Sequence, residues 1–223
     1  MSDHVTSKSD TSVDAKRSFS LGAWVRANVV GLGVAYGLFA LLGDLTEYGL
    51  GVAHDSLVRN LALLVAVLVG AALFAVLRHR VIAPHLHTPR WVVLGSFGSL
   101  AFGLIVGFVI AGPPFDFMLG VTSLGTIGGA LQWRAWRGRV DRPGGLLAAS
   151  IAGWMLAGVA VGAVAVFGVE ASIRLFGTPE DGTPAGIVGF VLILTLLGVV
   201  GGAAGGAVEG MALRRRLNAP RFE

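Results

Sequence analysis

Six apolar stretches, each long enough to cross a bilayer, run through this chain of 223 residues. The hydrocarbon core of a membrane is about 30 Å thick, and about twenty residues of α-helix span it. Because lipid offers no partner for backbone N–H and C=O groups, stretches of this length predict helices. We expect the six helices at Leu21–Gly43, Val58–Leu77, Trp91–Gly112, Phe115–Trp136, Gly145–Val169 and Pro184–Leu213.

The composition agrees with a lipid environment. Apolar residues make up 54% of the sequence and charged residues only 13%, against about 25% charged residues in soluble domains. The net charge of +4 comes from short basic clusters between apolar stretches, which is typical of membrane topology signals and not of a surface that binds nucleic acid. We therefore expect membrane lipids as partners and no nucleic acid. The sequence contains no Cys, which excludes disulfides and thiolate metal sites.

The basic residues predict the orientation of the helices. We place 14 of the 17 basic residues on one side, in the N-terminal tail, two loops and the C-terminus. Since Lys and Arg are enriched in cytoplasmic loops, we expect both termini in the cytoplasm and the protein in the cytoplasmic (inner) membrane. Residues 1–20 are polar and predict a disordered cytoplasmic tail. Residues 21–217 are expected to form the transmembrane domain, and residues 218–223 a C-terminal tail.

A twelve-residue phrase closes three of the apolar stretches. It reads GAALFAVLRHRV from Gly70, GALQWRAWRGRV from Gly129 and GAVEGMALRRRL from Gly206. Each copy starts with Gly-Ala, which lets helices approach closely, and ends with Arg-x-Arg, which is typical of an exit from lipid. The fold class is therefore an all-α integral membrane protein with six transmembrane helices, arranged as three pseudo-repeated hairpins at about 21–81, 91–140 and 145–217. The alternative is that a Gly-, Ala- and Arg-rich sequence produces the phrase by coincidence.

Glycines spaced four apart predict where the helices pack. Helices in lipid have no hydrophobic driving force toward one another, so close backbone approach supplies the contacts that join them. The glycines that we assign to packing are Gly33, Gly37, Gly103, Gly107, Gly158, Gly162, Gly202, Gly206 and Gly210. They favour packing within the bundle, and the alternative is a groove for a flat ligand or another subunit. Four tryptophans are expected at the cytoplasmic interface: Trp24, Trp91, Trp133 and Trp136.

Ionisable groups inside the hydrocarbon indicate a candidate polar site, because their burial is costly unless they are paired. Glu209 lies in the last predicted helix, and the repeat alignment sets it opposite Gln132 and Leu73. If the three hairpins surround a common axis, Glu209 and Gln132 face the same central space, where Arg134 or Arg26 could pair with the acid. The alternative is a shallow structural salt bridge, or a side chain that extends to the membrane interface.

The sequence holds little of the chemistry that cofactors and catalysis require. No His lies well inside a predicted helix, so we expect no histidine-ligated haem or chlorophyll held by this chain alone. His79, His85 and His87 share the second loop, but the His-x-His of His85 and His87 has no third ligand at a characteristic spacing, and we assign no metal site. The motifs of serine hydrolases, zinc proteases and nucleotide-binding loops are missing, so we assign no catalytic residue. The cofactor is unknown, and an apolar lipid or pigment is the class that these helices would accept.

A family resemblance is carried by Gly128-Gly129-Ala130-Leu131-Gln132-Trp133, which Arg137 follows. On a Gly-rich helix after another GxxxG helix, this segment resembles multi-span prokaryotic membrane proteins that repeat a GxxxxQWxxLR-like helix end. The Gln-Trp pair occurs only in the middle copy of the repeat. The function of that family is unknown, so the resemblance implies a multi-span fold and no activity.

Two functions are compatible with these features. The first is a non-enzymatic accessory or scaffolding subunit, which packs through Gly-rich helices in a larger membrane complex and holds lipid, quinone or pigment. The alternative is a small-solute or ion transporter or channel, with a central polar site near Glu209, Gln132 and Arg134. The small, apolar helix faces favour the first, and the polar residues that replace Leu73 in the other two repeats favour the second.

Overall fold

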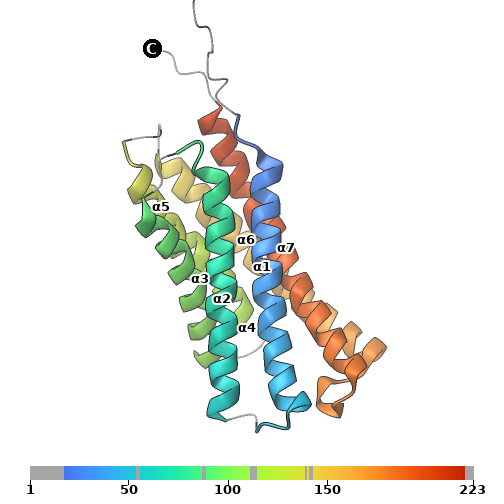
Figure 1. Ribbon diagram of the computed structural model, residues 1–223. Coiled ribbons are helices and arrows are strands. Elements are labelled where there is room, and N and C mark those ends of the chain that lie inside the picture. The colour runs from blue at the N-terminus through green and yellow to red at the C-terminus, as the bar shows by residue number, and fades with distance from the viewer. Residues whose placement is uncertain are drawn as a thin grey trace, which may run out of the picture.

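The computed structural model describes residues 18–53, 56–86, 89–110, 115–138, 140 and 143–218, and over these residues the protein is helical (Figure 1). Its long helices are α1 (Leu21–Asp44), α2 (Leu57–Ile82), α3 (Arg90–Ile110), α6 (Pro143–Phe176) and α7 (Pro184–Leu217). A broken helix combines α4 (Phe115–Ser123), the π-helical segment η2 (Leu124–Gly128) and α5 (Gly129–Trp136). The π-helical turn η1 (Leu45–Gly49) extends α1, and the 3-10 turn η3 (Pro179–Asp181) precedes α7.

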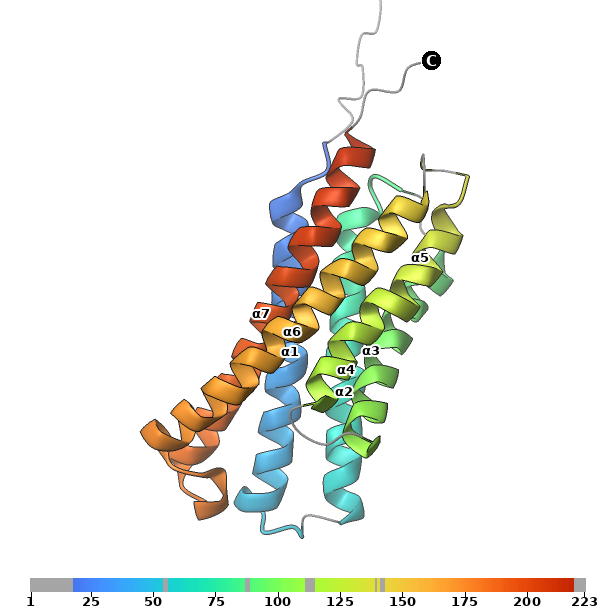
Figure 2. The same cartoon turned by 180° about the vertical axis from the view of Figure 1, so that it is seen from behind.

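The helices form a ring in chain order. α1 packs on α2, α2 on α3, α3 on α4, the broken helix on α6, and α6 on α7. The ring closes because α7 packs along α1, over the most extensive helix contact in the described part of the chain. Figures 1 and 2 show α1–α2, α3–α4 and α6–α7 as three successive antiparallel pairs.

Short polar side chains set the starts of three helices. Ser20, Ser56 and Thr183 each accept a hydrogen bond at 3.2 Å from the backbone N–H three residues later. Each bond satisfies a donor that the first helical turn would otherwise leave unpaired. Pro184 follows Thr183 at the first helical position, where its missing N–H costs nothing.

Four helices are long and apolar enough to cross a membrane: Leu21–Gly49, Leu57–Ile82, Pro143–Phe176 and Pro184–Leu217. The third and fourth predicted spans are not among these four helices. The third corresponds to α3, in which the apolar helix found within the described residues is shorter, Arg90–Val106. The fourth corresponds to the broken helix, which η2 interrupts. α6 also continues to Phe176 instead of ending at Val169, and its 34 residues make a helix about 51 Å long at 1.5 Å per residue.

Glycines let α7 approach α1 closely. A methyl group at Gly202 would lie 2.5 Å from the Asn28 carbonyl oxygen, and one at Gly206 would lie 3.0 Å from the Asn28 Cβ. On the facing side of α1, Gly33 and Gly37 lie against side chains of α7. The two backbones therefore make direct dispersion contacts, which is how small residues join helices in lipid.

The other glycines assigned to packing also face helices of this chain. Gly103 approaches α4, Gly158 and Gly162 approach α4 from α6, and Gly210 approaches α1. The surroundings of Gly107 lie outside the described residues. The glycine faces are thus used within the chain, and the outer surface that another subunit would meet is formed by larger apolar side chains such as Val159 and Leu192.

The two ends of the described chain lie side by side (Figure 1). The Phe19 N–H donates to Asn218 Oδ1 at 2.9 Å, and Asn218 Nδ2 donates to the Phe19 carbonyl oxygen at 3.4 Å. Phe19 is 2% exposed, and Ser20 caps α1. The prediction of disorder over residues 1–20 is therefore wrong at its C-terminal end, because burial of Phe19 offsets the entropy of ordering that segment. Residues 1–17 and 219–223 lie outside the described residues.

Candidate functional site

A buried ion pair joins α2 to α7. Arg78 Nη2 donates to both carboxylate oxygens of Glu209, at 2.8 Å to Oε1 and 2.7 Å to Oε2. The two side chains are 4% and 3% exposed. Taking two charges out of water has a free-energy cost that the pair offsets only when its geometry is good and its remaining polar atoms are hydrogen-bonded.

Three further side chains bond to Glu209. Trp154 Nε1 donates to Oε2 at 3.2 Å and Ser150 Oγ donates to Oε1 at 3.3 Å, both from α6. The amide of Gln132, on α5, is oriented by its partners: its nitrogen donates to Glu209 Oε1 and its oxygen accepts from Arg78 Nη2, each at 3.0 Å. We call Arg78, Gln132, Ser150, Trp154 and Glu209 the polar cluster. It connects α2, α5, α6 and α7.

Aromatic rings surround the Arg78 guanidinium. Its Cζ lies 4.5 Å from the ring centroid of Trp24, 5.2 Å from that of Phe74 and 5.7 Å from that of Trp154. A cation is attracted to the negative face of an aromatic ring, and the attraction is stronger when both are out of water. The rings therefore replace part of the hydration that the guanidinium loses on burial.

Small residues bring the broken helix within reach of α6. A methyl group at Gly125 would lie 2.6 Å from Trp154 Cβ, and one at Gly129 would lie 2.8 Å from Ser150 Oγ. The intervening π-helical segment adds a residue to the helical turn, which changes the direction in which later side chains emerge. Gln132, three residues beyond Gly129, reaches Glu209 from this position.

The structure brings two of the four predicted site residues together. Glu209 is 2% exposed, Gln132 is 6% exposed, and the two are in contact. Neither predicted basic partner reaches the acid. Arg26 is exposed and donates to a backbone carbonyl of its own helix, and Arg134 is exposed on α5. Both lie on outward faces of their helices, whereas Arg78 lies on the inward face of α2.

Arg78 is not among the predicted site residues, because it stands in an Arg-x-Arg that is typical of a helix end. In the structure it continues the face of α2 that carries the fully buried Ala71 and Phe74. Trp154 likewise shares the fully buried face of α6 with Ala157. Nearly every face of these helices is apolar in the sequence, so the spacing alone does not single out Arg78 or Trp154.

Two of the four tryptophans expected at the membrane interface are buried between helices, near one end of the bundle. Trp24 is 1% exposed and Trp136 is 2% exposed, whereas Trp91 is 40% exposed. Trp24 is buried because it packs beneath the Arg78 guanidinium, and Trp136 because it belongs to an apolar cluster with Phe19 at the same end of the bundle.

The structure describes two of the three histidines that the sequence places in the second loop. His85 packs edge-on against Phe19, with ring centroids 5.6 Å apart, and His79 is half-buried on α2. His87 lies outside the described residues. Among the described residues, no group of three or more His, Asp or Glu side chains could hold a metal ion.

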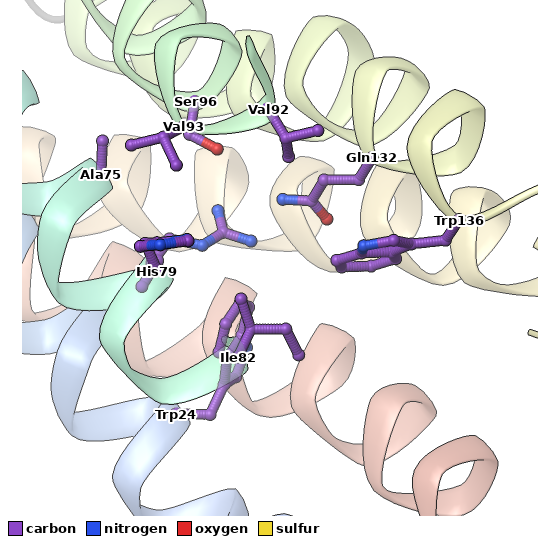
Figure 3. Close-up of a pocket in the computed structure, with 10 residues that line it drawn as sticks. Trp24, Ala75, His79, Ile82, Val92, Val93, Ser96, Gln132 and Trp136 are labelled. Carbon is purple, nitrogen blue, oxygen red and sulfur yellow. The ribbon is translucent and has the colours of Figure 1, made fainter. Parts of the chain in front are cut away.

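A small cavity of about 20 Å³ lies beside the polar cluster (Figure 3). Trp24, His79, Gln132 and Trp136 line it from α1, α2 and α5, and Arg78 forms part of its wall. A space of this size holds about one water-sized particle. The cavity is thus too small for an organic solute.

A larger recess lies on the outer surface between α1, α2 and α3. It has a volume of about 280 Å³ and an almost wholly apolar lining, of Phe39, Asn60, Leu63, Leu64, Val67, Leu104 and Ile105. Leu64 is 40% exposed and Ile105 is 39% exposed, so the recess opens to the surroundings of the bundle.

The chain matches no known protein family, no curated protein and no solved structure. The resemblance to multi-span membrane proteins therefore stays a prediction.

Proposed function

We propose that this chain is a non-enzymatic integral membrane protein that acts as an accessory or scaffolding subunit of a larger membrane assembly. The observation that carries the proposal is the apolar recess between α1, α2 and α3, with its volume of about 280 Å³. A lipid chain, the apolar part of a quinone or pigment, or a side chain of a neighbouring subunit has the chemistry to fill it. The Gly-rich faces no longer support this function directly, because they pack within the chain.

The interior of the bundle supports the same proposal. In the polar cluster, both oxygens of Glu209 accept hydrogen bonds, and Arg78 is enclosed by aromatic rings. The charged groups of the polar cluster bond to one another, so the cluster holds α2, α5, α6 and α7 together. A rigid bundle with an apolar exterior can present a fixed surface to lipid and to other subunits.

The topology that we propose has six crossings, with α3 and the broken helix added to the four long spans. In this topology the termini and the basic loops lie on the cytoplasmic side. The membrane that we propose is the inner membrane of a prokaryote. The sequence contains no Cys, so single cysteines report sidedness without background. In spheroplasts, a membrane-impermeant maleimide should label Glu180→Cys, in η3, and not Arg215→Cys, near the end of α7. The reverse pattern would contradict the orientation, and labelling of both in spheroplasts would contradict the crossing of the membrane by α7.

The test of the accessory function is extraction in a mild detergent, followed by native mass spectrometry and an absorption spectrum of the intact particle. We expect a stoichiometric subunit, lipid, quinone or pigment to remain bound. Leu64→Trp should release it, because the larger ring fills the recess. Leu61→Trp is the matched control, since Leu61 is 51% exposed on the same helix and does not line the recess. A bare chain, or equal effects of the two variants, would contradict the proposal.

A second candidate function is transport of an ion or small solute past the polar cluster. The π-helical segment beside Gln132 favours it, because such segments are frequent at functional sites in broken helices. This function predicts that Gln132→Leu, which keeps the Arg78–Glu209 pair, and Glu209→Gln both abolish flux in proteoliposomes. Glu170→Gln, in an exposed ion pair with Arg174, should leave it intact. Unchanged flux in Gln132→Leu would exclude the polar cluster as the transport site.

A further inference from the structure

The exposed charges at one end of the bundle all have the same sign. This is the end at which α2, α5 and α7 finish and α1 begins (Figure 1). Glu209 is the acid that the described residues place there, and it is buried and bonded to Arg78. The exposed charged side chains described at this end are Arg26, Arg80, Arg134, Arg137, Arg214 and Arg215. Such a surface attracts anions and has no exposed acid of its own among the described residues to neutralise it.

The basic residues of this surface are arginines and not a mixture with lysine. Of the 17 basic residues in the sequence, only Lys8 and Lys16 are lysines, and both lie outside the described residues. Lys and Arg mark the cytoplasmic side of a membrane protein alike, so a topology signal alone does not require arginine. The planar guanidinium can form two parallel hydrogen bonds with a phosphate, whereas an ammonium acts as a point charge. The choice of arginine therefore favours phosphate as the ligand.

Four of the arginines gather where α5, α6 and α7 meet. α6 packs on both α5 and α7, and Figure 2 shows its start between the ends of the other two. Arg134 and Arg137 lie at the end of α5, and Arg215 and Arg216 at the end of α7. Arg216 lies over the first turn of α6, since a methyl group at Gly145 would lie 3.1 Å from its Nη2. We call these four residues the arginine surface.

Apolar side chains continue the arginine surface toward the middle of the bundle. Met211 is 45% exposed on α7 and precedes Arg215 by four residues, a spacing that puts both on one helix face. Ala130 is exposed on α5 and precedes Arg134 by the same spacing. A soluble phosphate or a nucleic acid would use only the charged part of this surface. A phospholipid would use both parts, because its phosphate lies at the membrane surface and its acyl chains lie below.

Trp133 sets the depth of the arginine surface. The Arg137 Cζ lies 5.5 Å from the centroid of the Trp133 ring, and a guanidinium is attracted to the face of an indole. Trp is favoured at the level of the lipid headgroups, so the guanidinium beside it is placed where the phosphates of a bilayer lie. A side chain held by a ring also loses less freedom when it binds a ligand.

We propose that the ends of α5 and α7, on either side of the start of α6, form a binding surface for an anionic phospholipid of the leaflet at this end. The arginine surface binds its phosphate, and its acyl chains lie along the exposed face that contains Ala130 and Met211. The surface is separate from the apolar recess between α1, α2 and α3 and from the polar cluster. The proposal therefore holds whether the protein scaffolds an assembly or transports a solute.

The experiment uses the full chain, purified in mild detergent and freed of lipid. Native mass spectrometry follows titrations with phosphatidylglycerol and with phosphatidylcholine of the same acyl chains, and inorganic phosphate is titrated alone. A basic residue near an anionic headgroup contributes about 1 kcal/mol, a factor of about five in affinity. We expect saturable binding of phosphatidylglycerol, at least about 25-fold tighter than phosphatidylcholine, as two arginines would supply. Equal affinities for the two lipids would show apolar adhesion only, and equally tight binding of inorganic phosphate would show a site for soluble anions. Either result would overturn the proposal.

Matched variants locate the site. Arg134→Gln and Arg215→Gln each remove one exposed charge, from opposite sides of α6. We expect each to weaken phosphatidylglycerol about fivefold and the double variant about 25-fold, with phosphatidylcholine unchanged. Arg80→Gln is the control, since Arg80 is exposed at the same end but lies on α2, across the ring from α6. Circular dichroism checks that each variant is folded. Losses in Arg80→Gln as large as those in Arg134→Gln and Arg215→Gln would show a diffuse effect of charge and would overturn the assignment.

Discussion

Removing one partner of the Arg78–Glu209 pair is expected to cost more stability than removing one partner of an exposed ion pair, and Glu209→Gln tests this. The variant keeps the size of the side chain but leaves the Arg78 charge buried and uncompensated. Arg78 is 4% exposed and its Nη2 lies 2.7 and 2.8 Å from the two carboxylate oxygens. Breaking such a pair by removing one partner costs about 3–5 kcal/mol. At 1.4 kcal/mol per factor of ten, the unfolding equilibrium should shift about 100- to 4,000-fold.

The assay is equilibrium unfolding in mixed micelles, with a denaturing detergent as the titrant and helical circular dichroism as the signal. Glu170→Gln is the matched control. It removes the same charge from the pair with Arg174, whose side chains are 75% and 63% exposed, and exposed pairs contribute only about 0–1 kcal/mol. The reasoning is refuted if the two variants lose the same stability.

A double variant measures the interaction between Arg78 and Glu209 separately from the contacts that each side chain makes with its other neighbours. Arg78→Met alone removes the guanidinium from its aromatic enclosure and leaves the acid unpaired. Arg78→Met combined with Glu209→Gln buries no charge, so the double variant should lose less than the sum of the single losses, by about 1–3 kcal/mol. Additive losses would mean that the two side chains contribute independently.

Two further predictions concern helix packing and the chain ends. Gly202→Ala should destabilise the protein, because its methyl group would lie 2.5 Å from the Asn28 carbonyl oxygen; Gly98→Ala, where nothing lies within 4 Å, should be neutral or stabilise by up to about 1 kcal/mol through helix propensity. The same unfolding assay measures both, and equal losses would contradict close α1–α7 packing. Asn218→Ala should remove the link to Phe19 and increase amide hydrogen exchange at the start of α1, with about 1 kcal/mol lost. Unchanged exchange there would show that the link contributes nothing.

Several elements of the fold follow from local sequence. Long apolar stretches require helices in lipid because the backbone has no other partner there, and four helices long enough to span are present. Ser20, Ser56 and Thr183 are recognisable as caps at the starts of three of them. The sequence predicts that the fifth helix ends at Val169, whereas α6 continues to Phe176. The composition of residues 170–176 does not distinguish a helix from a loop.

The candidate site was predictable only in part. The repeat alignment sets Glu209 and Gln132 at one level. In the structure the Gln132 amide nitrogen lies 3.0 Å from Glu209 Oε1. The basic partner could not be chosen by depth alone, because Arg26, Arg78 and Arg134 all lie near helix ends at the same side of the bundle. Only the direction of each side chain around its helix separates the buried guanidinium from the two exposed ones.

The sequence by itself determined that this chain forms apolar helices with small residues at regular spacing and basic residues at their ends. The tertiary structure decided which faces turn inward, that α7 closes the ring on α1, and that Arg78 pairs with Glu209 beside a small cavity. The physical reason is that nearly every face of these helices is apolar or small, so hydrophobic periodicity carries little information about the inward direction. That direction is set by the close approach of backbones at glycines and by the polar groups that must find partners away from water.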